Sequence, residues 1–115
     1  MKNPKVNYEE YELANGECVA MSTAPILMLT LRKKDKKAYE TLSKVLVKGV
    51  NEKDALEVAE FLYAAYKNAN QDEEEAMTFT EFFESMNQSW QKNMEIIAEM
   101  YSPSKKQDSG TDSEE

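Results

Sequence analysis

Alternating apolar and polar residues near the start of the chain predict a β-hairpin over residues 6–21. The pair Asn15-Gly16 tolerates the positive φ angles of a type I′ turn, so we expect these two residues to form the loop. A period of two is typical of a strand with one buried face. The apolar positions of the two arms are Tyr11, Leu13, Val19 and Met21. An isolated hairpin is only marginally stable in water, so this one should pack against the rest of the chain or pair elsewhere.

The next segment, from about Thr23 to residue 34, is predicted to be a helix. Thr23 can cap its N-terminus, and Pro25 suits its first turn. A basic run at residues 32–34 suits a helix C-terminus. Apolar residues cover nearly every side of this helix, so it is either buried or exposed for a partner.

Two longer helices are predicted to follow. The second covers residues 35–48, and Gly49 is placed to end it in the left-handed conformation. Its apolar stripe consists of Ala38, Leu42, Val45 and Leu46. The third covers residues 52–69, with Asn51 and Asp54 resembling an N-terminal capping pair. Because apolar residues lie on most of its faces, the third helix should be central.

The last two predicted helices are shorter. Thr78 and Glu81 have the spacing of a capping box, which opens a helix that ends near Met86. A further helix begins near Ser89 and is ended by Pro103. Its apolar stripe contains Trp90, Met94, Ile97 and Tyr101, widened by Ile96 and Met100.

Together these elements predict a mainly α protein, a small bundle of four to five helices with an N-terminal β-hairpin. The chain of 115 residues has room for one domain. We assign residues 1–101 to that domain, with the hairpin at 6–21 and the bundle at 23–101. Residues 102–115 contain no large apolar side chain, so we expect a disordered tail rich in serine and acidic residues.

The composition argues against an enzyme and against a metal or cofactor site. The chain has no histidine and one cysteine, so it cannot form a Ser-His or Cys-His pair, an intrachain disulfide or a Cys/His zinc site. We expect Cys18 to be a small, partly buried apolar residue. No apolar segment approaches the roughly 20 residues that span a bilayer, and the first residues lack a signal sequence. We therefore expect a cytosolic protein without a membrane partner.

The charge is negative overall but unevenly distributed. The net charge is −8, while residues 32–48 carry +5 and residues 52–99 carry −9. The overall negative charge opposes binding to nucleic acid. The asymmetry reflects either solvated helix faces or attraction between the basic and acidic segments of different copies. The candidate residues for such an oligomer contact are Arg32, Lys33, Lys34, Lys36 and Lys37.

Seven methionines are many for a chain of this length. They serve either to fill gaps in a small core or to form an adaptable apolar surface for varied helical partners. Several lie close together late in the chain, which favours a partner-binding stripe there. The candidate partner-binding residues are Met86, Trp90, Met94, Ile97, Met100 and Tyr101.

A second function to consider is that of a small, degenerate EF-hand-like, calcium-responsive regulatory protein. Counting Asn70 as position 1 of a calcium loop brings Asp72 to position 3 and Glu81 to position 12. Position 6, which needs glycine for a sharp turn, is Glu75. The same residues are also explained by an acidic linker that leads into a capped helix.

The order of these signals resembles the tail assembly chaperones of long-tailed, siphovirus-type bacteriophages of Gram-positive hosts. The resemblance spans residues 8–106 and rests on the order and spacing of segments that are individually generic. These segments are YEEYELANGE at residues 8–17, DKKAY at 35–39, VLVKG at 45–49, LYAAY at 62–66, NAN at 68–70, MTFTEFF at 77–83 and SPSKK at 102–106.

The resemblance implies a binding role and no reaction. Members of that family bind the long, apolar, helical tape measure protein and keep it soluble until tail tube subunits assemble around it. They act in the host cell cytoplasm and are not part of the mature virion. The implied partners are therefore the tape measure protein, further copies of the chain and the tail tube protein. A net charge of −8 would help to keep such a complex soluble.

Overall fold

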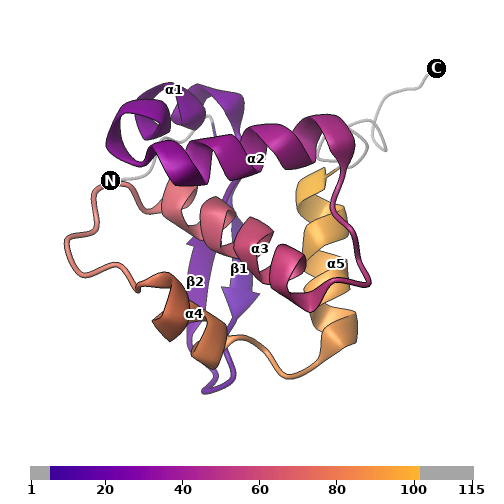
Figure 1. Ribbon diagram of the computed structural model, residues 1–115. Coiled ribbons are helices and arrows are strands. Elements are labelled where there is room, and N and C mark those ends of the chain that lie inside the picture. The colour runs from indigo at the N-terminus through magenta and orange to yellow at the C-terminus, as the bar shows by residue number, and fades with distance from the viewer. Residues whose placement is uncertain (1–5, 102–115) are drawn as a thin grey trace, which may run out of the picture.

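The computed structural model describes residues 6–101, and Figure 1 traces their elements. The predicted mainly α fold is confirmed, because 59% of the described residues are helical and the chain opens with a two-stranded antiparallel hairpin. The strands are β1 (Glu9–Glu12) and β2 (Cys18–Met21), and the helices are α1 (Pro25–Lys34), α2 (Lys36–Lys48), α3 (Ala55–Ala69), α4 (Phe79–Ser85) and α5 (Trp90–Tyr101). The predicted tail at residues 102–115 lies outside the described residues.

The hairpin turn differs from the predicted two-residue type I′ loop. Leu13 N–H donates to the carbonyl of Glu17 at 2.7 Å, and Gly16 N–H donates to the carbonyl of Leu13 at 2.9 Å. The loop therefore has three residues, and Gly16 supplies the positive φ of +93°. Such a loop, a turn followed by a glycine with positive φ, is the next most common way to close a hairpin.

The longer loop sets the register of the two strands. Tyr11 lies opposite Val19, and Glu9 lies opposite Met21, so the apolar side chains of both strands share one face. A two-residue loop would shift the register by one residue and turn one strand's apolar side chains outward. Cys18 is paired with Glu12 on the outer face and is exposed, so the prediction of a partly buried cysteine is wrong.

The helix boundaries follow most, but not all, of the predicted caps. Thr23 does not cap α1, which has no side-chain cap, and its hydroxyl instead donates to the carbonyl of Met100 at 3.1 Å. The side chain of Asp35 caps α2 by accepting from Ala38 N–H. Gly49 has the expected positive φ of +81°, but its ψ of 172° lies outside the left-handed helical region.

The remaining caps are close to the predicted ones. Helix α3 begins three residues later than predicted, because Asp54, and not Asn51, accepts from the first free N–H groups of the helix. The capping box of Thr78 and Glu81 is present at the start of α4. The hydroxyl of Ser89 accepts from Lys92 N–H and so caps α5.

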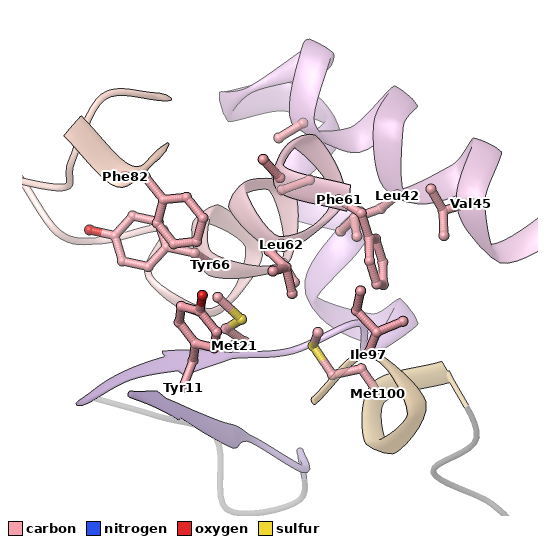
Figure 2. Close-up of a cluster of buried hydrophobic side chains, with 14 of the residues drawn as sticks. Tyr11, Met21, Leu42, Val45, Phe61, Leu62, Tyr66, Phe82, Ile97 and Met100 are labelled. Carbon is pink, nitrogen blue, oxygen red and sulfur yellow. The ribbon is translucent and has the colours of Figure 1, made fainter. Parts of the chain in front are cut away.

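Helix α3 is central, as predicted. It contacts α1, α2, α4 and β2, while α5 packs against β1 (Figure 1). Figure 2 shows the resulting core, in which α3 contributes Phe61, Leu62 and Tyr66. Phe82 of α4 stacks on Tyr66 with ring centroids 5.5 Å apart. Phe61, Leu62 and Phe82 are each 0% exposed and lie at the centre of this core.

Two buried polar groups connect distant parts of the chain. The Tyr11 hydroxyl donates to Asn93 Oδ1 at 2.6 Å and accepts from Asn87 N–H at 2.9 Å, which joins β1 to the start of α5. The Asn68 side chain donates to the carbonyl of Ser22 at 3.0 Å, which joins α3 to the segment after β2. Both asparagines are almost fully buried, and their hydrogen bonds offset the cost of that burial.

Candidate functional site

The stripe predicted to bind a partner is largely part of the core. Met86, Ile97 and Met100 are only 8%, 3% and 2% exposed. Figure 2 shows Ile97 and Met100 directed from α5 towards Phe61. The reason is that the hairpin and α3 leave an apolar surface uncovered, and the stripe of α5 covers it. Ile97 and Met100 are therefore unavailable to a partner unless α5 leaves the core, and Met86 is buried at the C-terminal end of α4.

The other residues of that stripe differ in exposure. Met94 is half-buried, and Trp90 is 42% exposed. The side chain of Tyr101 lies outside the described part of the structure. Within residues 6–101, the large apolar side chains that are exposed are Ile26, Leu29, Leu46, Val47, Leu56, Phe83 and Trp90. Most of the exposed apolar surface thus lies on elements other than α5.

A surface hollow of about 310 Å³ lies between α2, α3 and the start of α4, and we call it the α2–α4 hollow. Its lining residues are Asp35, Lys37, Ala38, Thr41, Glu60, Tyr63, Ala64 and Phe79. Ala38 and Ala64 are buried and come from two adjacent helices, so their methyl groups form an apolar floor. The small size of these two side chains leaves the space open.

Aromatic side chains form one wall of the hollow and continue to the surface. The rings of Tyr63 and Phe79 meet edge to face with centroids 5.4 Å apart. Phe83 follows one turn later on α4, 5.9 Å from Phe79, and is 46% exposed. A capping box holds the start of this short helix, and Phe82 anchors its opposite side in the core. The three rings therefore form a fixed aromatic surface.

Charged groups of both signs surround the apolar part of the hollow. Asp35 Oδ2 lies 3.8 Å from Lys67 Nζ. Lys37 and Glu60 also line the edge of the hollow. The Tyr63 hydroxyl donates to the carbonyl of Met77 at 2.9 Å. Burial, and then the negative charge of Asp35, raises the pKa of Tyr63 above its ordinary value of 10.0, so its ring stays uncharged near neutral pH.

This arrangement is suited to apolar side chains of a partner. The volume is at the lower end of the roughly 300–1,000 Å³ that ligand pockets occupy. An apolar floor, an aromatic wall and a polar edge are the features of a protein-binding hot spot. The pattern of the sequence did not predict this site, although Phe79 and Phe83 have i, i+4 spacing in a capped helix.

The basic residues predicted to form an oligomer contact lie together around the junction of α1 and α2. The guanidinium of Arg32 lies 5.9 Å from the centre of the Tyr39 ring, and Lys34 pairs with Asp72 at 2.8 Å. This pairing lowers the pKa of Asp72 below its ordinary value. Lys33, Lys36 and Lys37 are exposed and form no salt bridge within residues 6–101.

The segment considered as a calcium loop uses its side chains for other contacts. The side-chain amide of Asn70 donates to two backbone carbonyls, and Asp72 pairs with Lys34. Glu81 accepts from Thr78 N–H as part of the capping box. In the part of the chain that the structure describes, no three Cys, Asp or Glu side chains are grouped so that they could hold a metal ion.

Comparisons with known proteins add no family to this picture. Models of protein families, curated proteins and solved structures all gave no match to this chain. The function must therefore be inferred from the chain's own residues. No helix within residues 6–101 combines the length and the apolar character needed to cross a bilayer.

Proposed function

We propose that this protein is a phage tail assembly chaperone, which binds the tape measure protein and keeps it soluble while the tail tube assembles. The observation that carries the proposal is an open, aromatic-walled hollow on the surface of a strongly acidic helical protein. The ordered series of sequence signals that resembles this chaperone family supports the same function. The proposal assigns no reaction to the protein.

The hollow suits a client that is an apolar helix. Such a helix presents apolar side chains at i, i+3, i+4 and i+7, and one or two of them can enter a pocket while the others lie on the surrounding surface. Phe83 extends the aromatic wall beyond the hollow and provides that surface. Because the alanine floor and the aromatic wall are neutral, they recognise apolar character and not a particular sequence.

The acidic surface supports the second part of the role, which is to keep the client in solution. Once the apolar site is covered, the complex carries the net charge of −8 for every bound copy. Repulsion between like charges then opposes aggregation of coated clients. We place this activity in the host cell cytoplasm, before the tail tube protein replaces the chaperone, so that the chaperone is absent from the mature virion.

The proposal is tested by suppression of client aggregation. Denatured tape measure protein, diluted into buffer, aggregates and scatters light, and equimolar or higher wild-type protein should lower that scattering in proportion to its concentration. Phe83→Ser should weaken the effect several-fold, because it removes an exposed aromatic contact. Val47→Ser is the matched control, since Val47 is 81% exposed on α2 and does not line the hollow.

Two other results would contradict the proposal. If scattering is unchanged at any wild-type concentration, the protein does not hold this client. If Trp90→Ser abolishes the effect while Phe83→Ser does not, the client binds at α5 and not at the α2–α4 hollow. Adding calcium should leave the result unchanged, and a calcium-dependent response would favour the regulatory function instead.

A further inference from the structure

Helix α1 carries two large apolar side chains that the other elements of residues 6–101 leave exposed. Ile26 and Leu29 are 59% and 69% exposed and lie one turn apart. Lys33 and Arg32, whose guanidinium lies 5.9 Å from the centre of the Tyr39 ring of α2, follow at the next turn on the same side. We call these four residues the α1 face, which is apolar at its N-terminal end and cationic at its C-terminal end.

The positive charge continues beyond the helix. Lys36 and Lys37 begin α2 directly after the turn at Asp35, and both are exposed without a salt bridge in the described part of the chain. A partner for this surface must therefore cover two aliphatic side chains and supply several carboxylates. A second α1 face does not meet this need, because it supplies no carboxylate for the cations, and in a parallel pair it would bring like charges together.

The same chain carries a surface of the required chemistry. A hollow of about 430 Å³ lies between β1 and α5, and we call it the β1–α5 hollow. Among residues 6–101 its charged lining consists of Lys92, whose Nζ lies 3.6 Å from Glu12 Oε1, and the carboxylates of Glu9, Glu10, Glu12, Glu95 and Glu99. Half-buried Ile96 and the ring of Tyr11 give it an apolar base. In Figure 1, α1 lies at the left of the molecule and α5 at the right.

We propose that the α1 face of one copy docks into the β1–α5 hollow of a second copy. Cations then meet carboxylates, and Ile26 and Leu29 are covered. The two surfaces are different, so the contact is heterologous and each dimer retains one unused surface of each kind. The contact therefore repeats and builds short head-to-tail chains. This inference does not depend on the proposed client and is tested without it.

The first test is sedimentation velocity of the wild-type protein at increasing concentration. The weight-average mass should rise above that of the monomer, and the association should weaken about tenfold or more between roughly 0.05 and 0.5 M salt because exposed charges are screened. A wild-type protein that stays monomeric over the whole concentration range at low salt would overturn the inference.

Charge reversal identifies the two surfaces. Lys33→Glu/Lys37→Glu and Glu10→Lys/Glu95→Lys should each weaken association about tenfold or more when studied alone. Mixed together, the two variants should associate again, because their unaltered surfaces fit each other and the reversed α1 face of one fits the reversed hollow of the other. Ile26→Gln/Leu29→Gln should also weaken association, since it removes the apolar part while preserving helix propensity.

Matched variants separate the contact from a change in net charge. Lys44→Glu/Lys48→Glu and Glu73→Lys/Glu74→Lys alter the same number of exposed charges outside both surfaces and should associate as the wild type does, apart from a small effect of net charge. If the variant of the β1–α5 hollow associates normally, the occupant of the α1 face is not that hollow, and the inference fails. Equal effects from the matched variants would overturn it as well.

Discussion

A single hydroxyl group joins the hairpin to the last helix. Tyr11 OH donates to Asn93 Oδ1 and accepts from Asn87 N–H, and the ring is 2% exposed. Tyr11→Phe keeps the packing of the ring but leaves both partners without this hydrogen bond. We expect a loss of about 1–3 kcal/mol in the free energy of unfolding, measured by urea denaturation.

The control for this substitution is Tyr39→Phe. The hydroxyl of Tyr39 makes no hydrogen bond within residues 6–101, so the change should stay within about 0.5 kcal/mol. Equal stabilities of Tyr11→Phe and wild type would mean that the hydroxyl does not hold α5 against β1.

Tyr11 and Tyr63 make the stability of the fold depend on alkaline pH. Burial raises the pKa of Tyr11 and of Tyr63 above the ordinary value of 10.0. In the unfolded chain both ionise near pH 10, so from there to the folded pKa the unfolded state binds fewer protons than the folded state. Stability is therefore fully present below pH 10.0 and is lost as the pH rises through the raised folded pKa of each phenol.

The measurement is the urea midpoint from about pH 8 to about pH 11, compared between wild type and Tyr11→Phe. The advantage of the wild type over Tyr11→Phe should shrink above pH 10, because the variant has no phenol to ionise at this site. An advantage that is constant or grows across that range would contradict the raised pKa.

At the level of elements, the hairpin depends on Gly16. Its φ of +93° is unfavourable for other residues, while a Cβ added there would meet nothing within 4 Å. The cost of Gly16→Ala is therefore a backbone cost of about 1–2 kcal/mol, without a steric clash. In thermal or urea unfolding, stability should decrease from the wild type to Gly16→Asn, then Gly16→Ala, then Gly16→Val. If Gly16→Ala is as stable as the wild type, the turn relaxes to another conformation in the variant.

The elements themselves were largely predictable, because their signals are local. The capping residues Asp35, Asp54 and Thr78 lie at the starts of their helices. The predictions that were wrong concern a turn and a cap whose structure depends on residues far away in the sequence. The loop at Asn15-Gly16 gained one residue because that register gathers apolar side chains on one face, and Thr23 bonds to Met100 of α5 instead of capping α1.

At the level of the whole molecule, the sequence pattern could not say which apolar surfaces face inward. The sequence of an apolar stripe such as that of α5 has the same pattern whether the stripe covers the core or binds a partner. A chain of this size buries as much apolar surface as it can, so Ile97 and Met100 became core residues. The α2–α4 hollow was missed because it forms only when α2, α3 and α4 come together.

Different surfaces of the molecule are suited to different partners. The α2–α4 hollow with Phe83 has an apolar floor and an aromatic wall, which suit an apolar client. The α1 face and the β1–α5 hollow carry opposite charges, which suits contacts between copies. Several copies joined head to tail could therefore each offer a hollow to one long client helix.

The central claim is that the protein keeps an apolar helical client soluble, and co-expression tests it most directly. The client is the tape measure protein of the proposed function. The measurement is the fraction of that client in the cleared lysate, with and without this protein, and its co-purification with a tagged copy. The account predicts a largely insoluble client alone, a soluble and co-purifying client with the wild type, and a reduced yield with Phe83→Ser. A client that stays in the pellet, or becomes soluble without ever co-purifying, would contradict it.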